Sequence, residues 1–327
     1  MRMQDQDWME HLAIRAAWLS FVGGQTQGEI ASQLGVSPAK VHRLIAHAQK
    51  QGLIKFQIEG RPLECLQLED LLISEFGLKT CVIAPDVGGC DQESAIRSVS
   101  SVAAHVLAGL LSTTDIKRVG VGMGRTLKAS FEKMPRLSQP KLEIVSICGS
   151  LTRTLAANPY DVVQLLQERT GGEGYYLPVP YFAESAEEKD IFLGQRSVQD
   201  LMAKARHADV FVIGIGSIEE EGHLVQRDMI TSQEQVELHK SGAVCDLMGR
   251  FLTAEGKSVA VDLGDRAVGL HFQEVNGSRV IALVGGESKA DATLAALRSG
   301  VITDLVADET LAMALSDKIG LKLARSA

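Results

Sequence analysis

The chain has 327 residues, of which 45% are hydrophobic and 23% are charged. This length predicts two domains, and this composition is typical of a folded globular protein rather than a disordered one. The formal net charge of −8, taken over the whole chain, argues against nucleic acid as a partner.

The charge is unevenly distributed, however. Residues 1–58 carry six Lys or Arg against four acidic residues, a net charge of +2, which leaves −10 for the rest of the chain. Four of those six basic residues lie between Lys40 and Lys55, with two histidines among them. A local basic face on an acidic protein is compatible with DNA binding.

The five cysteines are scattered, odd in number and never spaced as CxxC. This spacing predicts neither a disulfide framework nor a metal site, and we expect no bound cofactor. No apolar run approaches the roughly 20 residues that span a bilayer, and the start of the chain lacks a signal-peptide pattern. We therefore expect a cytoplasmic protein without membrane association.

The first 35 residues predict two helices. Apolar residues recur with the spacing of one helical face at Leu12, Ala16, Leu19 and Val22, and two glycines end this first pattern. Thr26 and Glu29 form a T-x-x-E capping box, so a second helix begins near Gln27. This helix presents Ile30, Ala31 and Leu34 on one face and ends at Gly35, where a left-handed turn favours glycine.

A third helix begins immediately after this turn. Ser37 is a good N-cap and Pro38 suits the first helical position, and the buried face of the helix is predicted at Val41, Leu44, Ile45 and Ala48. Two helices joined by a short glycine-containing turn describe a helix-turn-helix, whose second helix enters the DNA major groove.

The exposed polar residues of this motif are the candidate DNA contacts. Arg43 suits a bidentate contact to guanine, whereas Lys40 and Lys50 suit phosphates. The full set of candidates is Thr26, Gln27, Ser37, Ala39, Lys40, His42, Arg43 and Lys50.

Gly52 closes the third helix, and the alternating residues 53–58 predict a short strand, which gives a winged helix-turn-helix. The alternative is a plain helical hairpin used for dimerisation. Because a net charge of +2 is modest, we expect two or more copies to act together on double-stranded DNA.

Helices alternate with short β-branched strands after Leu68. Helices are predicted at 68–77, 95–111, 161–172 and 289–300, and strands at 80–85, 118–124, 143–149, 208–217 and 279–288. This alternation predicts an α/β domain with a mainly parallel sheet, which binds ligands beyond the carboxyl ends of its strands.

Glycine-rich loops follow several of these strands. Glycine allows close backbone approach, helix starts offer free amides, and hydroxyl and basic side chains add donors, which together suit a phosphorylated small molecule. The loops contribute Gly122, Gly124, Arg125 and Thr126, then Gly149 and Ser150, then Gly214, Gly216 and Ser217, and finally Gly286 and Lys289.

No nucleotide or hydrolase motif fits better. The loop GVGMGR lacks the last glycine of GxGxxG, and GxxxxGK[ST], GxSxG and HExxH are absent. Glu220, Glu221 and His223 follow one glycine loop and could act as general acid and base groups, although a solvated acidic loop is the simpler interpretation. The alternative function is therefore a sugar-phosphate isomerase or deaminase with an accessory helical domain.

Taken together, the motifs TQGEIASQLGVSPAKVHRLIAHAQKQGLI, VGVGMGRTL, YYLPVPYF, ADVFVIGIGS, GAVCDLMGRFL and VIALVGGESKADATLAALRSGVITDLVADE resemble the SorC/DeoR-type sugar-responsive transcriptional regulators. They occur in the family's order and cover nearly the whole chain. Met123 replaces the aromatic residue that is frequent in that loop, and the DGAD signature of ribose-5-phosphate isomerase is absent.

The resemblance implies a winged helix-turn-helix domain at 1–58, a linker at 59–67, and an effector-binding and oligomerisation domain at 68–327. That last domain would be similar to glucosamine-6-phosphate deaminase and ribose-5-phosphate isomerase. The implied function is a repressor or another regulator of carbohydrate or polyol catabolism, acting as a dimer or tetramer. Lys289 would bind the effector's phosphate, and Asp246 and Arg250 its hydroxyls.

Overall fold

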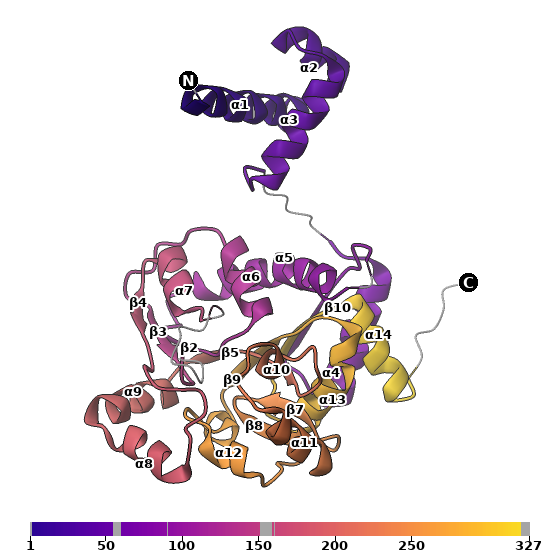
Figure 1. Ribbon diagram of the computed structural model, residues 1–327. Helices are drawn as coiled ribbons and strands as arrows, with labels where there is room; N and C mark the ends of the chain where they lie inside the picture. Colours follow the sequence, from indigo (N-terminus) through magenta and orange to yellow (C-terminus); the bar gives the residue numbers. More distant parts are fainter. Residues whose placement is uncertain (1, 55–59, 90, 151–158, 160, 322–327) are drawn as a thin grey trace. The chain divides into compact units, whose positions relative to one another are not determined.

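The computed structural model describes residues 2–54, 60–89, 91–150, 159 and 161–321. The chain divides into two compact units, Met1–Gly60 and Arg61–Ala327. Figure 1 shows the helices and strands of both units.

The amino-terminal unit, hereafter the head, is helical. Helix α1 (Arg2–Ala17) continues into a π-helical turn (Trp18–Val22), which is followed by α2 (Gln27–Leu34) and α3 (Pro38–Lys50). The capping box is present, with the Thr26 amide donating to the Glu29 carboxylate at 2.8 Å. Gly35 has a left-handed φ of 64° and the Ser37 hydroxyl caps α3. The predicted helix-turn-helix is confirmed.

Small residues of α1 hold the head together. Ala13, Ala16 and Ala17 are buried against the apolar side chains of α2 and α3, namely Ile30, Ala31, Val41, Leu44 and Ala48. Val22, which its spacing groups with Leu12, Ala16 and Leu19, is 71% exposed. The π-helical turn has more residues per turn than the α-helix, so it rotates Val22 away from the buried face.

The described residues at the end of the head do not form the strand expected for a wing. Helix α3 ends at Lys50, and Gly52 has a φ of 67°. Leu53 and Ile54 form no strand. Residues 55–58 of the expected strand lie outside the described residues, so the wing stays a prediction.

The second unit begins with α4 (Leu63–Phe76), and this helix starts inside the range predicted as linker. Its other helices are α5 (Gln92–Leu111), α6 (Arg125–Lys133), α7 (Val163–Thr170), α8 (Ala186–Gly194), α9 (Arg196–Arg206), α10 (His223–Gln226), α11 (Ser232–Lys240), α12 (Asp262–Arg266), α13 (Ala290–Arg298) and α14 (Glu309–Lys318), with 3-10 turns at Phe272–Val275 and Glu287–Lys289.

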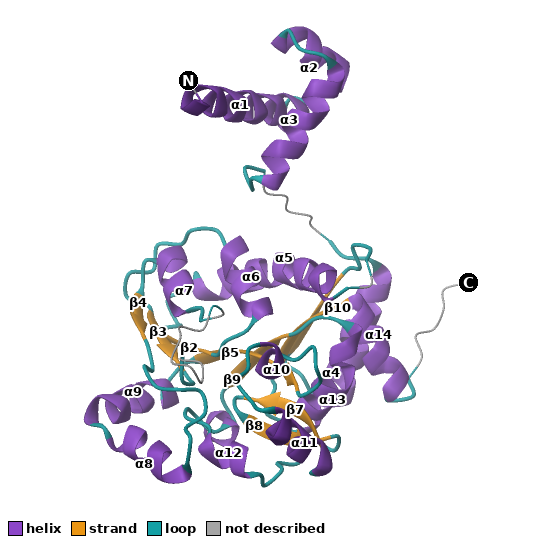
Figure 2. Ribbon diagram, viewed as in Figure 1, coloured by secondary structure: helices purple, strands orange, loops and turns teal. Residues whose placement is uncertain are grey.

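The strands of this unit form two sheets (Figure 2). The larger sheet is parallel throughout, in the order β1-β10-β9-β5-β2-β3-β4. Its strands are β1 (Thr80–Ala84), β2 (Arg118–Val121), β3 (Glu143–Ser146), β4 (Glu173–Tyr175), β5 (Val210–Gly214), β9 (Arg279–Leu283) and β10 (Asp304–Asp308). The smaller sheet is antiparallel, with β6 (Gly216–Ser217), β7 (Ala243–Leu247) and β8 (Arg250–Thr253).

The strand order of the larger sheet reverses at its centre. From β2 the chain proceeds outward through β3 and β4, whereas from β5 it proceeds outward in the opposite direction through β9 and β10. Connections that diverge in this way leave a crevice at the carboxyl ends of the two central strands, which is where open α/β sheets bind ligands.

Helices cover both faces of the larger sheet, which explains its continuous apolar strands. Val210 and Val212 of β5 pack into the layer with α5, α6 and α7. Phe211 and Ile213 point the other way, into the layer with α4, α9, α13 and α14. The predicted fold class, an α/β domain with a mainly parallel sheet, is confirmed.

Helix α5 explains the most apolar stretch of the chain. By length and composition alone it could cross a membrane. Ten of its residues are buried, however, among them Val99, Ala103 and Leu107, which pack in one cluster with residues of the sheet. Its apolar composition is therefore that of a core helix.

Candidate functional site

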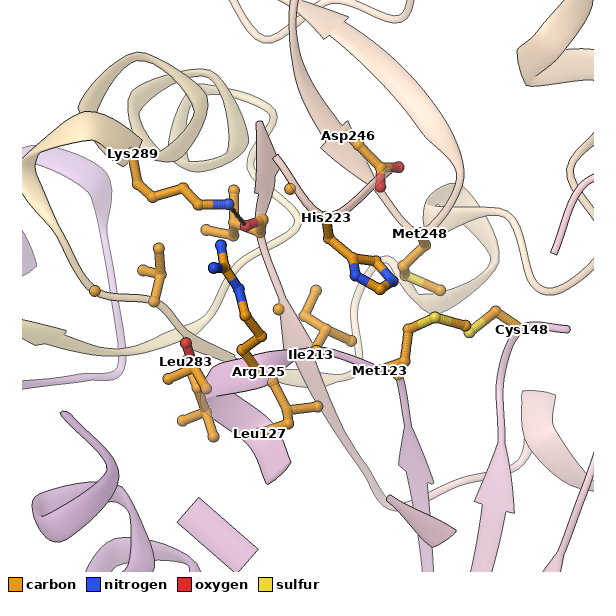
Figure 3. A pocket seen from close by; sticks show the side chains of 18 of the residues that line it. Met123, Arg125, Leu127, Cys148, Ile213, His223, Asp246, Met248, Leu283 and Lys289 are labelled. Atoms are coloured by element: carbon orange, nitrogen blue, oxygen red, sulfur yellow. Dashed lines mark hydrogen bonds between the residues drawn. The ribbon is translucent and has the colours of Figure 1, made fainter. Parts of the chain in front are cut away.

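A cavity of about 80 Å³ lies at the crevice formed by the two central strands. The segments that follow β2, β5 and β9 line it, together with β7 of the smaller sheet. Figure 3 shows its labelled side chains converging from these separate parts of the chain. The cavity therefore depends on the fold of the whole second unit.

The loop after β2 places a helix start at this cavity. Gly122–Gly124 lines the cavity and leads directly into α6, and no side chain caps the first turn of that helix. The first amides of a helix have no acceptor within the helix, and they carry the positive end of its dipole. This end of the cavity therefore favours an anion.

Two basic side chains approach one another here from opposite walls (Figure 3). Arg125 begins α6, and its guanidinium donates to the Glu221 carbonyl at 3.2 Å. The Lys289 amine donates to the Ile215 carbonyl at 3.0 Å. Burial, followed by the nearby Arg125 charge, lowers the pKa of Lys289 to about 8. Burial and the Arg125 charge both disfavour the charged amine. A bound anion would offset the effect of the Arg125 charge.

His223 lies beside these two cations. Burial, followed by the nearby charges of Arg125, Lys289 and Arg227, lowers its pKa to about 4. The imidazole is therefore neutral at physiological pH, so it can either donate or accept a hydrogen bond inside the cavity.

Asp246 supplies the acidic side chain of the cavity lining. It lies opposite Gly216 in the β6–β7 pair, and a Cβ atom at position 216 would come within 2.8 Å of its Oδ2 atom. Glycine is therefore required for this close approach. Burial raises the pKa of Asp246 to about 6, although the Gly249 amide donates to the carboxylate at 2.9 Å and opposes the shift.

The side of the cavity away from Lys289 is apolar. Met123, Cys148 and Met248 gather there in Figure 3. Burial raises the pKa of the Cys148 thiol, so this cysteine is uncharged. The cavity thus combines a cationic end, one carboxylate that can accept hydroxyl hydrogen bonds, and an apolar wall. A small molecule with one anionic group and several hydroxyls matches these features.

The structure brings most of the predicted effector residues to this cavity. The residues that line it are Gly122, Gly124, Arg125, Thr126, Gly214, Gly216, Asp246 and Lys289. Ser217 lies in an adjoining hollow that Lys289 also lines. Gly286 lies in a second adjoining hollow, where its amide donates to Asp308 at 2.7 Å.

Three predicted effector residues lie elsewhere. Gly149 packs so closely on Pro180 that an added Cβ atom would lie 2.1 Å from its carbonyl oxygen. The Ser150 hydroxyl is buried and donates to the Leu177 carbonyl at 2.9 Å. Arg250 lines a separate hollow with Lys189 and Arg206. Packing places the Gly149 backbone and the Ser150 and Arg250 side chains away from the cavity.

Other lining residues were missed by sequence reasoning. Gln92 at the start of α5 donates to the Gly285 carbonyl at 2.6 Å and borders the cavity. Tyr181 and Met248 also line it. They occur outside the glycine loops, and no local pattern in the sequence signals their position.

The candidate catalytic acids are not placed for catalysis in the cavity. Glu220 and Glu221 are exposed and line the adjoining hollow rather than the cavity itself. Glu221 contributes its backbone carbonyl to Arg125, not its carboxylate. Of the three residues, His223 alone lines the cavity.

The candidate DNA contacts form the exposed side of the helix-turn-helix. All eight predicted residues are exposed. The Thr26 and Ser37 hydroxyls also serve as helix caps. Within the described part of the chain, no carboxylate lies within ion-pairing distance of Lys40 or Arg43. Both cations are therefore available to an external polyanion.

Comparison with known proteins agrees with this arrangement. Residues 60–316 match the family model described as "Putative sugar-binding domain". The chain belongs to this family. It is also 38% identical to the erythritol catabolism regulatory protein EryD of Brucella abortus (strain 2308), over 96% of this chain and 98% of that protein.

Two further comparisons cover both units. The chain is 30% identical to the transcriptional regulator LsrR of Enterobacter sp. (strain 638), over 94% of this chain and 93% of that protein. The full-length sorbitol operon regulator SorC from Klebsiella pneumoniae has a similar fold, with a TM-score of 0.68, 23% identity, and coverage of 94% of this chain and 98% of that one.

These relatives are regulators, so the predicted membership of a SorC/DeoR-type regulator family is confirmed. The chain is a transcriptional regulator with a sugar-binding domain, not an isomerase or deaminase.

Proposed function

We propose that this regulator controls a carbohydrate or polyol catabolic operon in the cytoplasm, and that a small phosphorylated sugar or polyol sets its affinity for double-stranded operator DNA. The observation that carries the proposal is the pair of cations that line the cavity together, the half-buried Arg125 and Lys289. Burial and the neighbouring Arg125 disfavour the charge of Lys289, and an anionic ligand offsets this penalty.

The size and polarity of the cavity support a small effector. The cavity is about 80 Å³, and Arg125, Lys289, His223 and Asp246 all line it (Figure 3). The EryD relative is named for the catabolism of erythritol, a four-carbon polyol. We therefore place three- to five-carbon polyols and sugars, with one phosphate group, first among the effectors.

The head is proposed to read DNA through α3. Ser37, Ala39, Lys40, His42 and Arg43 occupy the start of α3, the part of a recognition helix that contacts base edges. Thr26, Gln27 and Lys50 are proposed to contact the phosphate backbone from its flanks.

Binding of the effector regulates DNA affinity only if it favours one arrangement of the heads in the oligomer over another. We propose a dimer or tetramer, because one head with a net charge of +2 contributes few phosphate contacts. In a two-fold symmetric assembly, two heads reach half-sites about one helical turn apart.

A thermal-shift screen tests the effector proposal. Glycerol, erythritol and ribose are each added to the full-length protein, free and as monophosphates. A ligand at 100 times its Kd stabilises the folded state by about 2.7 kcal/mol, so the right compound raises Tm by several degrees. We expect a phosphorylated compound to give the shift and its free form to give none.

Lys289→Ala tests whether the rise in Tm comes from ligand binding in the cavity rather than from a general effect of the compound on stability. Loss of one charge-assisted hydrogen bond weakens binding by roughly 10- to 100-fold, so the shift in Tm should fall to about half or less at the same ligand concentration. Lys128→Ala is the matched control, because Lys128 lies on α6 outside the cavity lining and faces Glu132. Equal shifts in both variants would contradict the proposed site.

A further inference from the structure

A second hollow of the Arg61–Ala327 unit lies between α8 and α9 on one side and β8 with the segment after α12 on the other. Helix α8 contacts both α9 and α12, and α12 contacts β8 (Figure 1). The hollow has a volume of about 230 Å³, against about 80 Å³ for the cavity. We name it the basic hollow, and the lining residues that determine its chemistry are Lys189, Leu193, Met202, Arg206, Arg250 and Glu274.

The charges that line the basic hollow do not balance. Lys189, Arg206 and Arg250 are cationic, and Glu274 is the acidic residue of the lining. The Glu274 carboxylate is already occupied, since one oxygen accepts from Arg206 at 2.6 Å and the other from the His271 amide at 2.7 Å. Within the part of the chain that the structure describes, no carboxylate lies within ion-pairing distance of Lys189 or Arg250. The lining therefore has an excess of two positive charges.

The described residues satisfy few of the polar hydrogens of Arg250 and Lys189. Arg250 donates to the carbonyls of Gly249 and Ala267, and both hydrogen bonds are 3.4 Å long, which is beyond the usual range of roughly 2.7 to 3.2 Å. Lys189 donates to the Asp265 carbonyl at 2.6 Å, whereas an ammonium group has three donors. Both side chains are half-buried, so their remaining donors are available to a ligand in the basic hollow.

The surroundings of these two side chains disfavour their charges. Burial, followed by the nearby Arg250 charge, lowers the pKa of Lys189, and burial lowers the pKa of Arg250. Burial and then the Arg250 charge also lower the pKa of the adjacent His271. The buried Met202 and the half-buried Leu193 line the same space, and an apolar lining strengthens electrostatic attraction. An anion bound between Lys189 and Arg250 would offset the repulsion between the two cations.

The basic hollow is distinct from the cavity, although the β7–β8 hairpin contributes to both. Asp246 and Met248 line the cavity, whereas Arg250 lines the basic hollow. A second pair of segments has the same arrangement, because Cys148 lines the cavity and its β-bridge partner Gly269 lines the basic hollow. Among the described residues, none lines both spaces. A ligand in the basic hollow therefore binds apart from the effector.

We propose that the basic hollow is a second anion site, which binds a phosphate group between Lys189 and Arg250, either as free phosphate or as part of a small metabolite. A phosphate monoester carries roughly 1.5 to 2 negative charges at pH 7, which matches the excess charge of the lining, whereas a carboxylate carries one. The planar guanidinium of Arg250 suits two oxygens of the same phosphate, and the Lys189 amine suits the third. This site does not depend on the proposed function.

A ³¹P NMR titration of inorganic phosphate into the full-length protein, at neutral pH and constant ionic strength, tests the site. All variants carry Lys289→Ala, which weakens any phosphate binding in the cavity. Adding Lys189→Gln should weaken phosphate binding by about tenfold, because one charge-assisted contact is lost. Lys128→Gln on α6 is the matched control, because Lys128 lies outside the basic hollow. Equal phosphate affinities in these two variants would overturn the proposal.

Glu274→Gln provides a test that misfolding cannot imitate. It removes the carboxylate of the basic hollow and releases Arg206 from its ion pair, while the glutamine carbonyl can still accept from the His271 amide. Inorganic phosphate should therefore bind several-fold more tightly than in the Lys289→Ala protein, because the repulsion from one negative charge is removed. Unchanged or weaker binding would overturn the proposal.

Arg250→Lys tests whether Arg250 recognises the phosphate by its shape as well as by its charge. Lysine keeps the positive charge but lacks the planar fork of the guanidinium. Affinity for inorganic phosphate should fall by about tenfold, as expected for the loss of one charge-assisted hydrogen bond. Unchanged affinity would overturn the assignment of Arg250 to this site.

Competition in the Lys289→Ala protein tests the identity of the anion. Acetate should displace little inorganic phosphate at equal ionic strength, because one negative charge does not balance the lining. Glycerol 3-phosphate should displace it, and tighter binding than that of inorganic phosphate supports a metabolite as the ligand, whereas weaker binding supports free phosphate. Acetate that competes as well as glycerol 3-phosphate would overturn the proposal.

Comparison with the wild type separates this proposal from the proposed function. Loss of all phosphate binding in the Lys289→Ala protein would assign the binding to the cavity alone and overturn the second site. Equal phosphate affinity of the wild type and Lys289→Ala would contradict the proposed phosphate contact of Lys289. The Lys189→Gln and Glu274→Gln results would then still decide whether the basic hollow binds phosphate.

Discussion

The head and the cavity both use Lys and Arg, but they place them in opposite environments. Lys40 and Arg43 are exposed on α3, whereas Lys289 is buried enough that its pKa falls to about 8. Exposed cations are screened by salt and can meet a long polyanion at many points. Buried cations are held in place and meet one anion. The same residue types therefore serve two kinds of ligand, and the environment determines which.

Salt concentration should have the largest expected effect, because it should weaken operator binding by the head far more than effector binding in the cavity. Raising the salt concentration from 50 to 200 mM should weaken operator binding by about 10³-fold or more if two heads make at least six phosphate contacts. Effector affinity should change by less than about tenfold, because cations inside a cavity are screened much less than exposed ones. Fluorescence anisotropy with labelled DNA and calorimetry with the effector measure how each binding constant depends on salt concentration. Equal salt dependence of the two binding constants would contradict the difference between exposed and enclosed cations.

Arg43→Ala should weaken operator binding by roughly 10- to 100-fold, the discrimination expected for one bidentate base contact. Lys50→Ala is the control at the end of α3, where a phosphate contact should weaken all DNA sequences uniformly. Competition between operator and random duplexes distinguishes the two. If Arg43→Ala weakens both duplexes equally, Arg43 contacts phosphate and the base assignment is wrong.

Effector binding should depend on pH through Lys289. Its pKa of about 8 means that the charged amine is lost as pH rises through 8, so affinity should fall by up to about tenfold per pH unit above that value. Below pH 6 the effector's phosphate becomes a monoanion, and Asp246, with a pKa of about 6, becomes protonated. Affinity should therefore be greatest between about pH 6 and 8.

Lys289→Arg is the variant that sharpens this pH test. Arginine stays charged above pH 8, so the decline on the alkaline side should move to higher pH. Calorimetric titrations at half-unit intervals would show it. A decline that stays at pH 8 would assign the titration to another group.

The smallest expected effect is on stability without effector. The folded-state pKa of Lys289 is lowered from 10.5 to about 8, so the buried charge destabilises the fold below pH 8 and this penalty disappears between pH 8 and 10.5. Lys289→Met should raise Tm by about 2 to 4 °C at pH 7, the shift expected for roughly 1 kcal/mol in a unit of this size. The difference from the wild type should shrink by pH 10. Lys128→Met should show no such trend.

The head was predictable almost residue by residue, because its signals are local. The Thr26–Glu29 capping box, the Gly35 turn and the Ser37 cap each act within four residues of chain, and all three are present. The position of Val22 was not predictable, because a π-helical turn depends on packing rather than on a local pattern.

The cavity was predictable only in part. Glycine loops after strands indicated Arg125 and Lys289, and parallel strands brought these two residues together. The same pattern could not show that Gly149 packs on Pro180 or that Arg250 lies in another hollow, since both depend on contacts with distant segments. The start of helix α4 was also not predictable from the local sequence, since the helix begins at Leu63, inside the range 59–67 that was predicted as a linker.

The connection of the cavity to distant segments has a consequence for proteolysis. Arg125 and Lys289 are separated by 164 positions in the sequence, yet one bound anion would contact both. Such a ligand acts as a non-covalent cross-link between the β2–α6 half and the β9–α13 half of the sheet. After cleavage of an exposed loop between them, the bound effector would then add to the packing that holds the two fragments together and slow their separation.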